Sequence, residues 1–221
     1  MIVNTEIKAR QDNNLSLAAD EFIWEEAGDS PVHHLVKPHI VDLLSKHSVI
    51  KVLDLGCGNG AFTHLLHQNG FKVEGFDGSA SGVELARKNY PEIQFSQLDL
   101  VSGRMPDHSK NQFDAVVSVE VIEHLLLPRM LIQNAIQALK PGGLLILTTP
   151  YHGYWKNLAI ALTNRFDAHW HPLRDYGHVK FFSKKTLMQL FIEFGLKDIR
   201  LVTVGRIPAL ACSMIVSGRK P

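Results

Sequence analysis

Between Val49 and Pro150, the hydrophobic positions of the chain alternate between two patterns. Short apolar runs, such as FDAVVSV, are followed by segments whose apolar residues lie three and four positions apart, such as AFTHLLHQ. The first pattern is typical of strands buried on both faces, and the second is typical of amphipathic helices. The alternation therefore predicts an α/β fold with a parallel sheet that is covered by helices on both faces.

Glycine and proline mark the boundaries of these elements. We expect strands at residues 49–56, 71–77, 93–99, 113–120 and 144–150. We expect helices at residues 61–70, 79–90 and 128–143. Before this region, residues 15–28 and 31–47 also have helical spacing, with a break expected near Pro38.

Residues 151–182 interrupt the alternation and contain 8 of the chain's 18 aromatic residues and 4 of its 12 histidines. The alternation resumes with a helix at 183–195, which Ser183 is suited to cap, and with apolar runs at 196–205 and 209–218. The interruption follows the fifth strand, on the carboxyl edge of the sheet, where open α/β sheets bind ligands. We therefore expect an N-terminal helical cap (1–47) and one α/β domain (48–221) with an insertion (151–182) at the ligand-binding edge of the sheet.

The composition fits a single domain. The chain has 221 residues, of which 45% are apolar and 20% are charged, as in ordinary soluble globular proteins. Cys57 and Cys212 fit no metal or disulfide spacing, which favours a reducing cytoplasm. The polar N-terminus lacks a signal-peptide pattern, and no apolar run approaches the length of a membrane span. We expect a cytoplasmic protein without a transmembrane segment, and the sequence indicates no oligomeric state.

Charge is distributed unevenly although the net charge is only +1. Residues 1–150 contain 12 Lys/Arg and 18 Asp/Glu, whereas residues 151–221 contain 11 Lys/Arg and 4 Asp/Glu. Either the last third faces an anionic partner or substrate, or its lysines are simply solvated.

A glycine loop, DLGCGNG, follows the first strand from Asp54 to Gly60 and opens a helix. Its glycines allow a sharp turn and close approach of a ligand. A dinucleotide fingerprint has the spacing G-x-G-x-x-G, but here Gly60 comes one residue early and Ala61 stands in its place. The Asp54 carboxylate would repel a diphosphate and attract a cationic amino acid or a sulfonium. The loop therefore argues against an NAD-dependent oxidoreductase, which we keep as an alternative.

Two further acids end the next two strands. Asp77 ends the second strand in VEGFDGS, where it can accept hydrogen bonds from both ribose hydroxyls. Asp99 ends the third strand in QLDL, where it can bind the exocyclic amine of an adenine. Each acid alone could be a turn or N-cap residue, which Asp favours. Three acids at successive strand ends beside a glycine loop favour a nucleoside site.

These motifs together resemble class I S-adenosylmethionine-dependent methyltransferases over residues 48–150. VLDLGCGNG resembles their first motif, and LKPGGLLILTTP resembles their turn into strand five. The resemblance implies a Rossmann-like, doubly wound, seven-stranded sheet of order 3-2-1-4-5-7-6, with an antiparallel last strand in SMIVSGRK. It implies that the glycine loop holds the methionine part of the cofactor. The implied cofactor-binding residues are Asp54, Gly56, Cys57, Gly58, Gly60, Asp77, Gly78, Asp99, Leu100, Val119 and Glu120.

The segment EVIEHL after the fourth strand contains Glu120, Glu123 and His124 at spacing i, i+3, i+4. If a helical turn begins there, the three side chains share one face. In a first interpretation, the carboxylates complement the helix dipole and the imidazole packs on the sheet. In a second, Glu120 alone lines the cofactor pocket. In a third, the cluster binds Mg²⁺ or another divalent cation, together with a ligand from elsewhere in the chain.

The cluster resembles a metal-binding segment of one methyltransferase group and a closely similar segment of another. Small-RNA 3′-end 2′-O-methyltransferases and ubiquinone-biosynthesis O-methyltransferases carry E-x-x-E-H and a later histidine before an aromatic stretch. The resemblance implies the ligands Glu120, Glu123, His124 and His178. The RNA enzymes have Pro-Asn after strand five, whereas this chain has Pro150 followed by tyrosine, and their basic RNA-binding flank is not evident. The sequence therefore favours a small or lipid-like acceptor, with RNA methylation as the alternative.

The insertion offers further candidates. His152, His169 and His171 are each a candidate general base, a solvated residue or a packed residue. The aromatic residues Tyr151, Tyr154, Trp155 and Trp170 are expected to form a lid core over an apolar acceptor.

We therefore expect a methyltransferase that moves the methyl group of S-adenosylmethionine to an acceptor hydroxyl by in-line displacement. A divalent cation would assist it, or Glu120 or His152 would accept the proton. Lys156, Arg165, Arg174 and Lys180 suit an acceptor that carries a carboxylate or phosphate. A non-catalytic cofactor-binding module is the remaining alternative.

Overall fold

The computed structural model describes residues 24, 26, 28–101, 104–205 and 211–221. Most of the helix expected at residues 15–28 lies outside the described residues. Among the described residues, no helix is long and apolar enough to cross a membrane.

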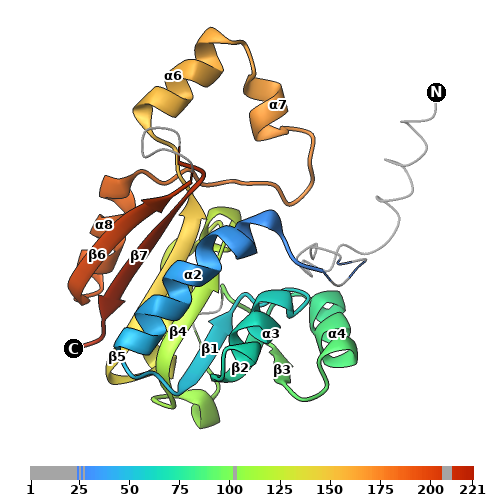
Figure 1. Ribbon diagram of the computed structural model, residues 1–221, viewed down its shortest axis with the longest axis vertical. Coiled ribbons are helices and arrows are strands. Elements are labelled where there is room, and N and C mark those ends of the chain that lie inside the picture. Colours follow the sequence, from blue (N-terminus) through green and yellow to red (C-terminus); the bar gives the residue numbers. More distant parts are fainter. Residues whose placement is uncertain (1–23, 25, 27, 102–103, 206–210) are drawn as a thin grey trace.

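A seven-stranded sheet of order β3-β2-β1-β4-β5-β7-β6 forms the centre of the molecule (Figure 1). The strands are β1 Lys51–Leu55, β2 Lys72–Asp77, β3 Gln94–Gln97, β4 Phe113–Val119, β5 Leu139–Pro150, β6 Lys197–Val204 and β7 Ser213–Arg219. The pairs among β1 to β5 are parallel, and β7 runs antiparallel to both of its neighbours. This arrangement confirms the predicted strand order and the antiparallel last strand.

Helices cover both faces of the sheet. The described helices are α2 Pro31–Lys46, α3 Ala61–Gln68, α4 Ala80–Asn89, α5 Pro128–Ala138, α6 Tyr154–Leu162, α7 Phe166–Trp170 and α8 Lys184–Glu193, with short 3-10 turns η1 Asp107–Ser109 and η2 Ile122–His124. Of these, α6 and α7 lie beyond the end of the sheet (Figure 1). The apolar faces of α2, α3 and α4 join one core cluster, and those of α5 and α8 join another. In the middle of β4, Ala115 and Val117 belong to one cluster and Val116 to the other, as expected for a strand buried on both faces.

The break expected near Pro38 is wrong, because α2 continues through this proline. Proline removes one intrahelical hydrogen bond and costs about 3 kcal/mol in a helix interior. Pro38 lies on the exposed side of the helix, whereas Val36, Ile40 and Leu44 are fully buried on the other side. Burial of this apolar face holds the helix together across the proline.

The helix expected to run to residue 143 ends earlier. The α5 helix stops at Ala138, and β5 begins at Leu139, which pairs with Phe113. The register between β4 and β5 then shifts, so the Lys-Pro-Gly-Gly stretch belongs to an irregular strand start instead of a helix end. By contrast, α8 begins after Ser183, whose side chain accepts a hydrogen bond from the Thr186 backbone, as the sequence predicts.

Candidate active site

The glycine loop lies between β1 and α3, at the carboxyl edge of the sheet. Gly56, Gly58 and Gly60 all have positive φ angles, of 89°, 51° and 79°. A Cβ at Gly56 would come within 2.4 Å of a Val121 methyl group, so no larger residue fits there. The backbone N–H of Gly56 donates to the carbonyl of Phe76, 2.7 Å away, and thereby ties the loop to β2.

Asp54 lies beneath this loop and is fully buried. One of its carboxylate oxygens accepts a 2.7 Å hydrogen bond from the Thr63 hydroxyl on α3. Burial, together with the nearby Asp77 and against the opposing effect of the Thr63 hydrogen bond, raises the pKa of Asp54 to about 7. Cys57 is also buried, which raises the pKa of its thiol well above the usual value. Asp54 therefore anchors the loop to α3 through Thr63, a partner that could not be predicted from the sequence.

Asp77 joins the loops that follow β1 and β2. Its Oδ2 accepts a hydrogen bond from the Gly58 backbone N–H at 2.7 Å, and its Oδ1 accepts one from Ser79 at 2.8 Å. Each carboxylate oxygen has a second lone pair. Asp99 lies beyond the end of β3 and is exposed, and its Oδ1 accepts a hydrogen bond from the Val101 N–H at 2.9 Å. The three predicted acids thus lie at three neighbouring strand ends, as expected.

The segment before α2 covers the glycine loop, which the sequence did not indicate. The indole of Trp24 packs so closely on Gly58 that a Cβ there would lie 2.4 Å from it. The side-chain amide of Asn59 donates to the carbonyls of Glu26 and Gly28, at 3.1 and 3.2 Å. The tryptophan in the apolar run FIW was the available signal in the sequence.

Glu120 follows β4 in a left-handed backbone conformation, with φ of 54°. Its N–H donates to Thr148 Oγ at 3.0 Å, and the same hydroxyl donates back to Glu120 Oε1 at 2.8 Å. The Ser213 hydroxyl donates to the same oxygen at 2.8 Å. Burial raises the pKa of Glu120 despite these hydrogen bonds and the nearby Lys156. The sequence did not predict these hydrogen bonds from β5 and β7 to Glu120.

Glu123 is fully buried in η2. Its Oε2 accepts a 3.0 Å hydrogen bond from the Thr149 hydroxyl, whereas Oε1 has no partner among the described residues. Burial and the nearby Glu120 raise the pKa of Glu123 well above its usual value. An unpaired carboxylate oxygen in this position is costly, so it marks a place where a ligand would be stabilised.

Two imidazoles face this oxygen. His178 Nε2 lies 4.0 Å from Glu123 Oε1, and the ring centroids of His124 and His178 are 4.8 Å apart. Burial lowers the pKa of His124, and it lowers that of His178 to about 4, so both rings are neutral at pH 7. The N–H groups of Val179 and Lys180 donate to the Glu123 carbonyl, both at 2.9 Å. These hydrogen bonds hold the segment that carries His178 against η2.

Three of the four predicted metal ligands therefore meet. Ligand atoms of Glu123, His124 and His178 all lie within 4.8 Å of one another. The expected helical turn is wrong in detail, because a 3-10 turn begins only at Ile122. Glu120 precedes this turn in a left-handed conformation and does not belong to the group of three.

The insertion places His152 in an aromatic cluster. Its ring lies 4.8 Å from the Trp170 ring and 5.4 Å from that of Phe181. Both of its ring nitrogens are buried without a hydrogen-bond partner among the described residues. Burial and Lys156 lower the pKa of His152 to about 4. Trp170 thus belongs to a lid core as predicted, but Tyr154 and Trp155 are exposed and do not.

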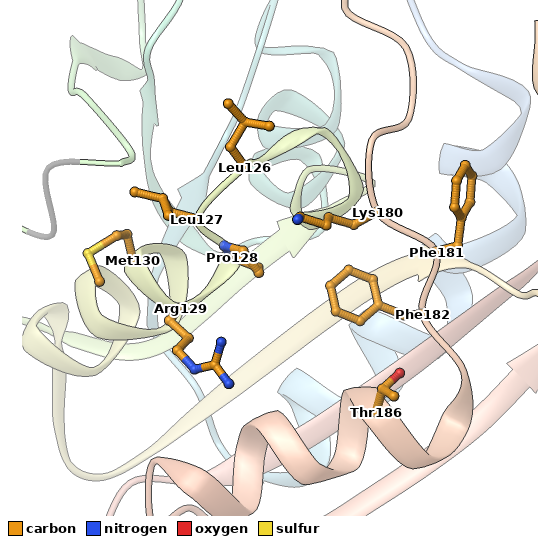
Figure 2. A pocket seen from close by; sticks show the side chains of 9 residues that line it. All are labelled: Leu126, Leu127, Pro128, Arg129, Met130, Lys180, Phe181, Phe182 and Thr186. Carbon is orange, nitrogen blue, oxygen red and sulfur yellow. The ribbon is translucent and has the colours of Figure 1, made fainter. Parts of the chain in front are cut away.

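An apolar groove of about 350 Å³ is lined by residues that follow His124 and His178 in the chain (Figure 2). The residues at the start of α5 form one wall, and the segment leading into α8 forms the other. The lining residues are Leu126, Leu127, Pro128, Arg129, Met130, Lys180, Phe181, Phe182 and Thr186. The groove combines a mostly apolar lining with two cationic side chains.

Comparison with protein families identifies the chain. The family model described as "Methyltransferase domain" matches residues 31–201, from the start of α2 into β6. The chain belongs to this methyltransferase family. It is a class I methyltransferase that uses S-adenosylmethionine, and the oxidoreductase alternative is set aside.

The methyltransferase is 24% identical over 183 residues to the ubiquinone biosynthesis O-methyltransferase of Rickettsia canadensis, covering 79% of this chain and 77% of that protein. It is 35% identical over 166 residues to the mitochondrial ubiquinone biosynthesis O-methyltransferase of Mus musculus, covering 66% of this chain and 44% of that protein. Among solved structures, the magnesium protoporphyrin IX methyltransferase of Synechocystis PCC 6803 with bound SAH has a TM-score of 0.65. That match has 18% identity and covers 89% of this chain and 90% of that chain, so it shows a shared fold.

Proposed function

We propose that this methyltransferase methylates a hydroxyl of a small, partly apolar acceptor, and that Glu123, His124 and His178 hold a divalent cation beside the acceptor. The observation that carries the proposal is the unpaired, buried Oε1 of Glu123, which faces two imidazoles. One carboxylate and two neutral imidazoles suit a divalent cation such as Mn²⁺, and Mg²⁺ would need additional oxygen ligands. When bound, the cation would lower the pKa of the acceptor hydroxyl and orient its oxygen.

The cofactor would lie along the ends of β1 to β4. We assign the methionine part to the loop Asp54–Gly60 and the ribose to Asp77 and Gly78. Asp99 and Leu100 would bind the adenine, while Val119 and Glu120 would line the methionine side. The positive φ angles of the loop glycines, and the hydrogen bond by which Asp77 at the end of β2 holds the Gly58 N–H, support this assignment.

The reaction moves a methyl group from sulfur to the acceptor oxygen. The acceptor oxygen attacks the methyl carbon in line with the sulfur, the carbon–sulfur bond breaks, and S-adenosylhomocysteine leaves. The residues' main task is to align the three atoms and exclude water. The acceptor proton would pass to Glu120 or His152, the two candidate bases at this edge.

The acceptor assignment rests on the groove and on charge. The apolar lining of the groove suits a hydrocarbon or aromatic body, and Lys180 suits an acidic substituent, whereas Arg129 pairs with Glu193 at 3.1 Å. Both curated relatives are named ubiquinone biosynthesis O-methyltransferases, which supports a small-molecule acceptor over the RNA alternative.

A methyl-transfer assay tests the proposal. The full chain is incubated with S-adenosylmethionine and either a panel of phenolic acids or short RNA, with and without a chelator. We expect transfer to a phenolic hydroxyl and a chelator effect of about 100-fold, since a cation that activates an oxygen supplies several kcal/mol. Glu123→Gln and His178→Ala should match the chelated enzyme, with exposed Glu84→Gln as control. Methyl transfer only to RNA would overturn the proposal. So would transfer that neither the chelator nor either variant reduces. Cofactor binding without any turnover would favour the non-catalytic module.

A further inference from the structure

An asparagine lies in the buried face of α5. Asn134 is fully buried, and its neighbours on that face are the apolar residues Leu131, Ala135 and Ala138. Burial of an amide costs free energy unless its polar atoms form hydrogen bonds. Among the described residues, Nδ2 of Asn134 donates to the Leu100 carbonyl at 3.0 Å, whereas Oδ1 has no partner. The hydrogen bond to Leu100 is therefore what this amide contributes at an otherwise apolar position.

This hydrogen bond reaches the Asp99 carboxylate through one peptide unit. The Leu100 carbonyl and the Val101 N–H belong to the same planar peptide unit. The carbonyl accepts from Asn134, and the N–H donates to Asp99 Oδ1 at 2.9 Å. Because the peptide unit is rigid, fixing its carbonyl also fixes the direction of its N–H. Asn134 therefore acts on the Asp99 carboxylate through the intervening peptide unit.

The same helix holds a second point of the segment that follows β3. Gln137 lies three positions after Asn134, on the same side of α5. Its Oε1 accepts a hydrogen bond from the Met105 N–H at 3.3 Å, and Met105 is buried. Closer to β3, the Leu98 N–H donates to the Asp77 carbonyl at 2.8 Å. The described part of this segment is thus attached both to the end of β2 and to α5.

We propose that Asn134 is a positioning residue for adenine recognition. It holds the peptide unit between Leu100 and Val101 so that the Asp99 carboxylate faces the exocyclic amine of the cofactor. The inference rests on the assignment of the adenine to Asp99 and Leu100 that we propose above. A carboxylate only accepts and an amine donates, so this contact favours adenine over a base that has a carbonyl at the same position.

A role in positioning differs measurably from a role in folding. A variant that only lowers the stability of the folded chain weakens every ligand by the same factor, because the ligands bind the folded state alone. The ratio of two affinities is therefore independent of stability. Loss of orientation at Asp99, by contrast, weakens a ligand that uses its hydrogen bond more than a ligand that does not.

Isothermal titration of the full chain with S-adenosylhomocysteine and with S-inosylhomocysteine measures this ratio. The second ligand has a carbonyl in place of the exocyclic amine. We expect the unchanged chain to prefer S-adenosylhomocysteine by about tenfold, because the carbonyl leaves an acceptor unpaired. Asn134→Leu and Asn134→Ala should reduce the preference to about twofold. Asn89→Leu, the same substitution at an exposed position of α4, should keep the full preference.

A double variant separates this inference from the adenine assignment. Asp99→Asn should reduce the preference at least as much as Asn134→Leu does. The double variant should have the same preference as Asp99→Asn alone, because both substitutions act on one hydrogen bond.

The outcomes of these titrations are distinguishable. If Asp99→Asn loses the preference and both Asn134 variants keep it, the positioning role is overturned and the adenine assignment stands. Independent losses that add in the double variant, or an equal loss in Asn89→Leu, would also overturn the positioning role. If Asp99→Asn keeps the preference, or the unchanged chain has none, the adenine assignment fails and the positioning role fails with it.

Discussion

The two halves of the carboxyl edge of the sheet satisfy their buried polar groups differently. In the donor half, at the ends of β1 to β3, the acids bind protein groups: Asp54 accepts from Thr63, and Asp77 accepts from two backbone N–H groups. In the acceptor half, at the ends of β4 and β5, hydroxyl groups hold Glu120 and Glu123 but leave one oxygen of Glu123 unpaired among the described residues. An unpaired buried acceptor costs about 1–3 kcal/mol. The acids of the donor half are therefore held by protein groups, whereas the acceptor half leaves a buried oxygen for the cation that we propose.

The largest expected effect is a loss of cofactor binding by the donor half. Gly56→Ala should weaken S-adenosylhomocysteine binding by about 100-fold or more, because the added Cβ meets Val121 and displaces the loop. Gly70→Ala is a matched control, since Gly70 has the same φ of 89° but open space around its Cα. Both variants carry backbone strain of about 1–2 kcal/mol. Isothermal titration measures the binding, and equal affinities in the two variants would contradict a ligand-holding loop.

The next effect concerns the pH dependence of stability in the donor half. The pKa of Asp54 is raised from 3.8 to about 7, so the folded state holds a proton that the unfolded state releases. The stability that this proton contributes is fully present below pH 3.8 and is lost as the pH rises to about 7. The total loss of stability over this range is at most about 4 kcal/mol. Asp54→Asn keeps an oxygen for Thr63 and should remove this dependence. Urea unfolding across this pH range measures it, and parallel curves for the two proteins would refute the assignment.

A smaller effect is expected on the stability of the acceptor half. Thr149→Val removes the hydroxyl that binds Glu123 Oε2 and should lower the free energy of unfolding by about 1–3 kcal/mol. Thr149→Ser keeps the hydroxyl and should retain most of that stability. Chemical denaturation compares the two variants. If Val and Ser are equivalent, the hydroxyl does not hold the glutamate.

The smallest effect is expected at the exposed end of the donor half. Asp99→Asn should weaken S-adenosylhomocysteine binding only several-fold, because a neutral acceptor replaces a charged one in a single hydrogen bond worth about 1 kcal/mol. Asp107→Asn, at an exposed ion pair with Lys110, serves as the control. If Asp99→Asn lowers the affinity as much as Gly56→Ala does, the adenine contact contributes far more to binding than we expect.

The sequence predicted most of the fold because apolar periodicity reports burial directly. The seven strands, their order and the Ser183 cap follow from local patterns and from the resemblance. Pro38 misled the prediction because its local preference was outweighed by the burial of Val36, Ile40 and Leu44, which only the packing of α2 on the sheet provides.

The candidate site was predictable in its residue types but not in its supporting contacts. The resemblance implied the ligands Glu120, Glu123, His124 and His178, and the structure brings the last three together. The hydroxyl groups of Thr148 and Ser213, which lie far from Glu120 in sequence, could not be inferred, because strand register alone brings them to the same place. The same holds for Trp24, whose contact with Gly58 depends on how the chain enters α2.

Titration of the full chain with Mn²⁺, followed by electron paramagnetic resonance, tests most directly the claim that the acceptor half is completed by a bound cation. We predict one saturable site per chain in the unchanged protein. Glu123→Gln and His178→Ala should lose it, while Glu84→Gln and exposed Asp107→Asn should keep it. Equal Mn²⁺ binding by all five proteins, or no site in the unchanged chain, would contradict the account.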